Sequence, residues 1–202
     1  MSKALPPLVG IDGCRAGWIA AISLPEQSPF VKVFANFASI PAALPDDAIL
    51  AVDMPVGLPD LVKAGGRGPE QAVRPLLGER QSSVFSIPSR AAVRASDYGE
   101  ACALSLETSD PPRKVSRQAF NLFPKIREID DLITQDLSRR LFEVHPEVAF
   151  WRLNGERAMR LPKKIKGKVN PEGMLERMRL LETHGIGEGL LAAKPPRGDW
   201  PG

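Results

Sequence analysis

Two short apolar runs that each end in an aspartate constrain this chain more than any other feature. The first, VGID at residues 9–12, leads directly into the turn-forming stretch GCRAG at 13–17. The second, ILAVD at residues 49–53, is followed by methionine and proline. Short apolar runs bounded by glycine and proline are typical of buried strands. If the two strands share one sheet, Asp12 and Asp53 form an acidic site at its edge.

Further apolar segments predict a mixed five-stranded sheet flanked by helices, an α/β fold. Short connections favour three antiparallel strands first, and a crossover then allows the fourth and fifth strands to lie parallel to the first. We expect strands at residues 8–11, 18–24, 30–37, 48–54 and 140–144. We expect helices at residues 40–44, 97–106 with Ser96 as the N-cap, 124–137, 146–153 and 171–184 with Met174, Met178 and Leu181 on one face.

The length of 202 residues fits one domain, here interrupted by a segment rich in glycine and proline. Residues 55–94 predict a loop-rich insertion with one short helix near 70–77. Long irregular segments inside compact domains tend to be functional loops or disordered.

The bulk chemistry limits the partners and the location. The net charge of +3 is compatible with nucleic acid without demanding it. The two cysteines have no metal-like spacing, which favours a reducing cytoplasm. The start of the chain lacks a signal-peptide core, and no apolar stretch reaches the roughly 20 residues that span a membrane. We therefore expect a cytoplasmic protein without a membrane partner, and a homodimer stays open.

The strand-end acids favour a hard divalent cation. Two neighbouring carboxylates repel each other unless a cation lies between them, and oxygen-only ligation suits Mg²⁺ or Mn²⁺. Asp12 and Asp53 are the first candidates, and Glu143 at the end of the fifth strand is the third. The structural alternatives are a turn aspartate before Gly13 for Asp12, and an aspartate that holds backbone groups before Pro55 for Asp53.

Cations and hydroxyls elsewhere are candidates for phosphate contacts. The stretch 80–90 combines arginine and serine side chains that can grip phosphate, and the basic stretch 160–168 can follow a nucleic-acid backbone. An ordered lid and a solvated charge run are the corresponding structural alternatives. The nucleic-acid-binding candidates are Arg15, Arg80, Ser82, Ser83, Arg90, Lys125, Lys163 and Lys164. His145 is interpreted as a residue that holds the strand-to-helix corner.

Six motifs in consistent order resemble one protein family. They are GIDGCRAGW at 10–18, VDMPVGLP at 52–59, LGERQSSVF at 77–85, SRQAF at 116–120, PKIREID at 124–130 and EVHPE at 143–147. Together they cover about residues 8–184 and are similar to family 429 of the domains of unknown function, described as predicted RNase H-like nucleases related to Holliday-junction resolvases. The resemblance implies an RNase H-like fold with Asp12, Asp53 and Glu143 as its acids.

The chain departs from the family pattern in two places. It has Arg67-Gly68-Pro69-Glu70 where the family commonly has a Cys-Asp pair after an arginine. The family usually closes with a helix that opens on paired aspartates, but residues 190–202 contain only Asp199, so the chain looks shortened at its C-terminus.

These observations lead to one expectation and two rivals. We expect a nuclease dependent on Mg²⁺ or Mn²⁺, in which Asp12 and Asp53 bind the metal and Glu143 is a ligand or positions water. The first rival is a non-catalytic module that binds nucleic acid or a nucleotide, inactive because the last acidic helix is absent. The second is a phosphatase-like hydrolase of small phosphoesters.

Overall fold

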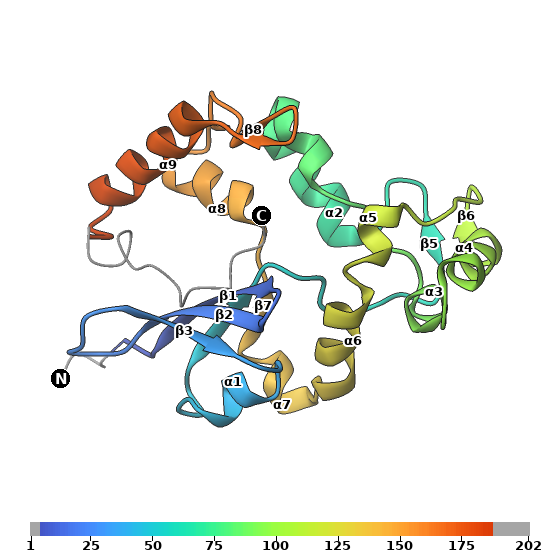
Figure 1. The fold of residues 1–202 in the computed structure, drawn as a ribbon, viewed down its shortest axis with the longest axis horizontal. Helices are drawn as coiled ribbons and strands as arrows, with labels where there is room; N and C mark the ends of the chain where they lie inside the picture. Colours follow the sequence, from blue (N-terminus) through green and yellow to red (C-terminus); the bar gives the residue numbers. More distant parts are fainter. Residues whose placement is uncertain (1–4, 188–202) are drawn as a thin grey trace.

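The computed structural model describes residues 5–187, and its centre is the expected mixed sheet (Figure 1). The strand order is β3-β2-β1-β4-β7. The first three strands are antiparallel, whereas β4 and β7 run parallel to β1. Their bounds are β1 Leu8–Cys14, β2 Gly17–Ser23, β3 Phe30–Phe34, β4 Ile49–Val52 and β7 Leu141–Glu143. The predicted α/β class and the predicted sheet are therefore confirmed.

One face of the sheet carries the hydrophobic core. Val9 and Ile11 of β1 alternate with exposed residues and lie beside Leu50 and Val52 of β4. Side chains from α1 (Ser39–Ala42), α6 (Phe123–Leu132) and α7 (Gln135–Ser138) complete this layer. Glu128 of α6 fastens the layer to the sheet, because its Oε2 accepts hydrogen bonds from the Trp18 indole and the Phe37 amide, both at 2.8 Å.

Two helix predictions need correction. The helix expected over 124–137 is two helices, because Ile133 has extended backbone angles and the Thr134 hydroxyl caps α7 by accepting from the Leu137 amide. The N-cap of α4 (Tyr98–Glu107) is Asp97 and not Ser96, since Asp97 Oδ1 accepts from the Glu100 amide at 2.9 Å. In both places a side-chain oxygen captures a free backbone N–H at the start of a helix.

The segment 55–94 contains more helix than expected. It forms α2 (Gly68–Val73), the 3₁₀ segment η1 (Arg74–Ser83) and α3 (Arg90–Arg94), and β5 (Val62–Lys63) pairs with β6 (Ser109–Asp110). Pro69 lies in the first turn of α2, where a missing N–H costs nothing. Its glycines and prolines therefore mark helix ends as well as loops. The short helix α5 (Arg117–Phe120) follows later in the chain.

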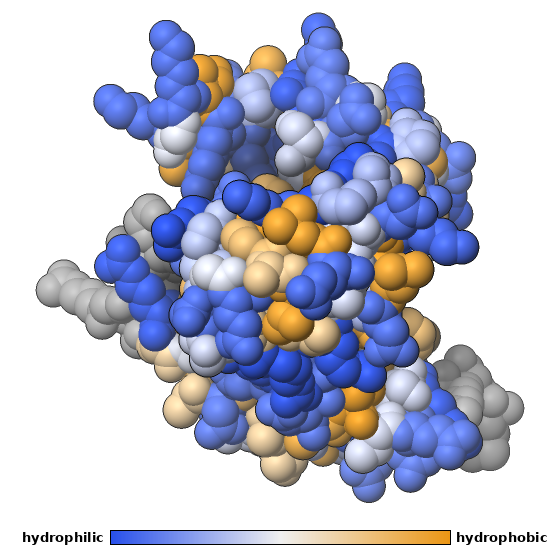
Figure 2. Space-filling view, turned by 90° about the vertical axis from the view of Figure 1, so that its right-hand side faces the viewer, coloured by the Kyte–Doolittle hydropathy of each residue, from blue (hydrophilic) through white to orange (hydrophobic). Residues whose placement is uncertain are grey.

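The last described elements lie on the other side of the sheet from α1 and α7 (Figure 1). They are α8 (Pro146–Leu153), β8 (Lys164–Ile165), β9 (Lys168–Val169) and α9 (Pro171–Thr183). Hydrophilic residues dominate this upper end of the molecule in Figure 2. None of the helices within residues 5–187 has the length and apolarity needed to cross a membrane.

The face of α9 that packs inward differs from the predicted one. Its buried residues are Gly173 and Arg177, whereas Met174 and Met178 are exposed. A Cβ atom at position 173 would collide with the Pro162 carbonyl oxygen. Glycine therefore permits the segment that contains Pro162 to approach α9 closely. The inward face of α9 is held by the ion pair between Arg177 and Glu147 rather than by an apolar stripe. The apolar pattern of the sequence therefore predicted the wrong face.

Candidate active site

Asp12 and Asp53 lie next to each other at the carboxyl ends of two adjacent parallel strands. Ile11 of β1 is the register partner of Val52 of β4, and the Asp53 amide donates to the Ile11 carbonyl at 2.9 Å. The next residues, Asp12 and Asp53, therefore stand side by side on strands about 4.8 Å apart. Ile11 and Val52 point into the core, so both aspartates point to the opposite face.

The environment of the two aspartates disfavours their ionised forms. Burial, followed by the negative charge of Asp12, raises the pKa of Asp53 to about 6. Protein atoms also crowd the Asp12 carboxylate, and this desolvation raises the pKa of Asp12 even though the Gly13 amide donates to its Oδ1 at 2.7 Å. Two carboxylates that resist ionisation together have the charge pattern of a cation site.

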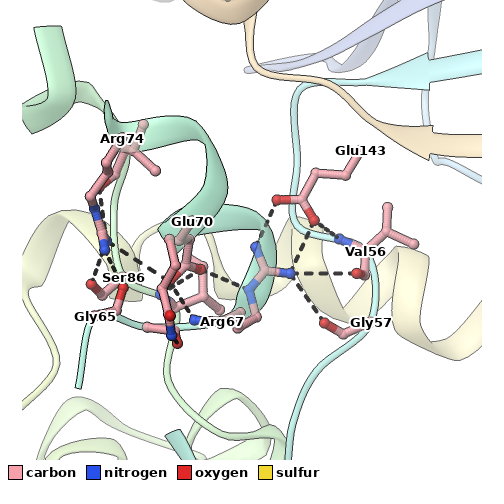
Figure 3. Close-up of polar contacts among 12 residues, drawn as sticks. Val56, Gly57, Gly65, Arg67, Glu70, Arg74, Ser86 and Glu143 are labelled. Carbon is pink, nitrogen blue, oxygen red and sulfur yellow. Dashed lines mark hydrogen bonds and ion pairs between the residues drawn. The ribbon is translucent and has the colours of Figure 1, made fainter. Parts of the chain in front are cut away.

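Glu143 belongs to the same cluster of acids but faces a different partner. It is the register neighbour of Val52 at the end of β7, and its charge contributes to the raised pKa of Asp53. Its two carboxylate oxygens lie 2.7 and 3.0 Å from the guanidinium nitrogens of Arg67 (Figure 3). The Val56 amide donates to Oε2 at 2.9 Å. Glu143 is thus bound to the segment that follows β4.

Lys163, in the segment between α8 and β8, brings a positive charge to the aspartates. Its charge opposes the rise in the pKa of both Asp12 and Asp53. Its ammonium nitrogen lies 3.9 Å from Glu147 Oε1, and its side chain is 45% exposed. An ammonium that is close to the acids and still open to solvent is free to meet an anionic ligand.

A buried ion pair places the Lys163 loop. Arg177 of α9 donates to both oxygens of Glu147 on α8, at 3.2 and 2.7 Å, and each side chain is only 3% exposed. Arg177 Nη1 also donates to the Leu161 carbonyl at 3.0 Å and to the Gly173 carbonyl at 2.8 Å. These bonds join α8, α9 and the segment before Lys163 into one unit.

His145 joins the site to η1. Its Nε2 lies 3.3 Å from the Ser83 carbonyl and 3.4 Å from the Ser83 hydroxyl, while desolvation lowers the pKa of His145. Within the described residues, its buried Nδ1 has no hydrogen-bond partner, so no carboxylate completes a Ser-His-acid triad there. The position supports the interpretation of His145 as the residue that holds the corner between β7 and α8.

The predicted phosphate-binding residues separate into two groups. Lys163 lies near the aspartates, Ser83 contacts His145 two residues after Glu143, and Arg80 Nη2 donates to the Arg160 carbonyl at 3.0 Å, in the segment before Lys163. The candidates of the second group have other surroundings among the described residues: Arg15 is exposed in the turn after β1, Ser82 is exposed within η1, Lys164 is exposed on β8, Arg90 pairs with Asp130, and Lys125 pairs with Glu128 over the Trp18 ring, beside Gly13.

The comparison with family models decides the family. A model described as a protein of unknown function (DUF429) matches residues 10–199. The chain belongs to the DUF429 family. The matched span contains the three acids, Arg67 and Lys163 of this DUF429 protein. No curated protein matches the chain, and neither does any solved structure. The predicted shortening after residue 190 lies outside the described residues.

The donors of this DUF429 protein fit a cation held by two carboxylates. Across residues 5–187, no three histidine, cysteine, aspartate or glutamate side chains stand together as a metal-binding group. Mg²⁺ needs only one or two carboxylates, because it keeps several of its water ligands. Asp12 and Asp53 would supply these oxygens, and a divalent cation would relieve their mutual repulsion.

The raised pKa of Asp53 predicts a stability effect in the metal-free protein. Between its unfolded value of 3.8 and about 6, folded Asp53 keeps a proton that the unfolded chain has lost, so its contribution to stability disappears as pH rises through 6. Asp53→Asn should therefore raise the free energy of unfolding at pH 7 by up to about 3 kcal/mol and leave it nearly unchanged at about pH 3, below both pKa values. Urea denaturation in EDTA measures both values.

The matched control for this experiment is Asp47→Asn. Asp47 is exposed and lies just before the other end of β4. The control should follow the parent protein at both pH values. Equal stability of Asp53→Asn and parent at pH 7 would show that the Asp53 carboxylate is not under electrostatic strain.

Sequence reasoning did not identify the roles of Arg67, Glu147 and Arg177. A signal was available for Arg67, because Glu70 follows at the three-residue spacing of a capping box, and the structure shows the half of that box in which the Arg67 amide donates to Glu70 Oε2 at 3.0 Å. Glu147 lies inside the EVHPE motif, but no local pattern connects it with Arg177, which is 30 residues away in the chain.

Proposed function

We propose that this protein is an RNase H-like nuclease that hydrolyses phosphodiesters with Mg²⁺ or Mn²⁺. The observation that carries the proposal is the convergence of Asp12 and Asp53 at the ends of adjacent parallel strands. The strand order and the three antiparallel strands followed by two parallel ones support the RNase H-like relation. When bound to the two aspartates, the cation would polarise a phosphoryl oxygen and stabilise the charge that develops during hydrolysis.

Nucleic acid is the partner that best fits the surroundings of the acids. Lys163 lies beside the aspartates, and Lys164, Lys166 and Lys168 follow it on or next to the exposed β8–β9 hairpin. A line of lysines that leads away from an acidic centre suits a polyanion whose phosphates extend beyond the cleaved bond. A small phosphoester would need only the cation and Lys163.

Lys163→Met should weaken nucleic-acid binding uniformly across sequences. The variant removes one phosphate contact, so the slope of log K against log salt concentration should become shallower by about one. Fluorescence anisotropy with a labelled DNA duplex in EDTA measures the slope without cleavage. Lys114→Met, on an exposed loop before α5, is the control and should keep the parent slope. An unchanged slope in Lys163→Met would remove Lys163 from the nucleic-acid surface.

The direct test is a substrate panel with and without the cation. Four-way DNA junctions, linear duplexes, RNA–DNA hybrids, single-stranded RNA and phosphomonoesters would be incubated with the protein in Mg²⁺, Mn²⁺ or EDTA. The proposal expects cleavage of at least one nucleic acid that stops in EDTA. Turnover of phosphomonoesters alone would favour the phosphatase-like reading instead.

A non-catalytic binding module is the second candidate, and the Glu143–Arg67 pair favours it. Both oxygens of Glu143 are bonded to Arg67, so only two acids of the cluster remain open to a cation. This candidate expects nucleic-acid binding of equal strength in EDTA and in Mn²⁺, with no cleavage of any substrate in the panel.

We also propose a cytoplasmic location, supported by Cys14 and Cys102, which are both buried and free. Thiols that stay unpaired are typical of a reducing compartment. The homodimer stays a prediction, and light scattering of the purified protein measures it directly.

A further inference from the structure

We propose that the site holds one divalent cation rather than two. Arg67 is paired with Glu143, the third carboxylate of the cluster, and its guanidinium brings the positive charge that a second ion would supply. This inference rests on the proposed function, since it concerns the cation that Asp12 and Asp53 would bind. It assigns a positioning role to Arg67, which acts through Glu143 and not by contact with substrate.

The carboxylate of Glu143 has no oxygen left without a partner. Its Oε1 accepts from Arg67 Nη2 at 2.7 Å, and its Oε2 accepts from Arg67 Nη1 at 3.0 Å and from the Val56 amide at 2.9 Å. A guanidinium that meets a carboxylate through two parallel hydrogen bonds is among the strongest pairings that proteins use. A metal ion that took Glu143 as a ligand would have to compete with this pairing for the same carboxylate.

Arg67 is held in place from every side (Figure 3). It is 8% exposed, and its Nε donates to Glu70 Oε1 at 2.7 Å. Its Nη1 also reaches the Gly57 carbonyl at 3.1 Å, and its own amide donates to Glu70 Oε2 at 3.0 Å. Glu70 is itself 2% exposed. If Glu143 moved away, a buried guanidinium would lose two of its bonds, which is costly in a protein interior.

The positive charges already present leave little for a second ion to neutralise. Arg67 pairs with Glu143 and Glu70, and Lys163 brings its charge to the aspartates, so Asp12 and Asp53 are the carboxylates left for one divalent cation. Paired metal ions in hydrolases lie about 3.5–4 Å apart and share ligands between them. Here a second ion on the Glu143 side would face the Arg67 guanidinium, and like charges repel.

A Mn²⁺ titration of the full chain tests this inference without any assay of activity. Electron paramagnetic resonance of free Mn²⁺ at pH 7.5 counts the bound ions, and we expect one per chain. Asp53→Asn should raise the Kd at least about tenfold, as loss of a ligand does. Glu143→Gln should still bind one ion, with a Kd within about threefold of the parent value. Glu107→Gln, an exposed residue at the end of α4, is the matched control.

The outcomes separate this inference from the proposed function. One ion in the parent and in Glu143→Gln supports the inference. Two ions per chain, or a loss of affinity above tenfold in Glu143→Gln, overturns the inference and leaves the nuclease proposal standing. No bound Mn²⁺ in the parent overturns the proposed function and this inference together.

Discussion

Asp12→Asn is expected to slow Mn²⁺-dependent phosphodiester cleavage by about 100-fold or more, the scale on which loss of one charge-stabilising group acts. Asp12 supplies one of the two carboxylates that converge at the ends of β1 and β4. Asparagine keeps the size of the side chain but removes the charge that attracts the cation. The rate would be measured on the best substrate of the nuclease panel at saturating Mn²⁺.

The control for this prediction is again Asp47→Asn, because it removes one negative charge near the opposite end of β4. It should cleave at the parent rate. Circular dichroism of Asp12→Asn should match that of the parent, since within residues 5–187 the Asp12 carboxylate accepts a hydrogen bond only from the adjacent Gly13 amide. Cleavage by Asp12→Asn at the parent rate would show that the paired aspartates are not the active site.

Arg177→Met is expected to lower the free energy of unfolding by about 3–5 kcal/mol, as does the loss of one partner of a buried ion pair. The substitution leaves the Glu147 carboxylate, which is 3% exposed, without its guanidinium. It also frees the Leu161 and Gly173 carbonyls that Arg177 Nη1 bonds. Urea denaturation followed by circular dichroism measures the loss.

An exposed ion pair at the end of α8 supplies the control. Arg152 and Glu156 also form an ion pair, but their side chains are 72% and 55% exposed. Arg152→Met should change the free energy of unfolding by less than about 0.5 kcal/mol, because water replaces the lost bond. The double variant Glu147→Gln/Arg177→Met should regain part of the lost stability. A loss below about 1 kcal/mol in Arg177→Met would show that this pair does not hold α9 to α8.

The same substitution should also affect function through Lys163. The Leu161 carbonyl bonded by Arg177 lies two residues before Lys163, and Glu147 contacts the Lys163 ammonium. Release of this loop should displace the ammonium from the aspartates. Nucleic-acid binding by Arg177→Met, measured at a temperature where the variant is folded, should therefore resemble that of Lys163→Met.

Local sequence patterns correctly predicted the strands and helices that are specified by neighbouring residues. The apolar runs at residues 9–12 and 49–53 form β1 and β4, and Pro146 opens α8 with the predicted bounds Pro146–Leu153. In each case neighbouring residues carry the signal, as alternation, as a turn or as a proline in the first helical turn. Where a capping oxygen competes with helix continuation, as at Thr134, the same reasoning missed the boundary.

Long-range electrostatic contacts had no such signal. Arg67 and Glu143 are 76 residues apart in the chain, yet their pairing decides how many acids of the cluster remain open. Arg177 lies on α9 among exposed methionines, and the apolar pattern of that helix pointed to Met174 and Met178 instead. A charged residue buried by a distant partner violates the pattern on which the prediction of a helix face rests.

The sequence by itself determined the α/β sheet with three antiparallel strands followed by two parallel ones, and the meeting of Asp12 with Asp53, because strand periodicity and short turns are local properties and parallel neighbours end at the same edge. The family motifs determined the assignment to DUF429. Only the tertiary structure decided that Glu143 pairs with Arg67 and that Lys163 lies near the aspartates. It also decided that Arg177 bonds the segment just before Lys163. Those contacts form between segments far apart in the chain, so no local sequence pattern indicates which residues are partners. Burial strengthens the attraction between the paired charges.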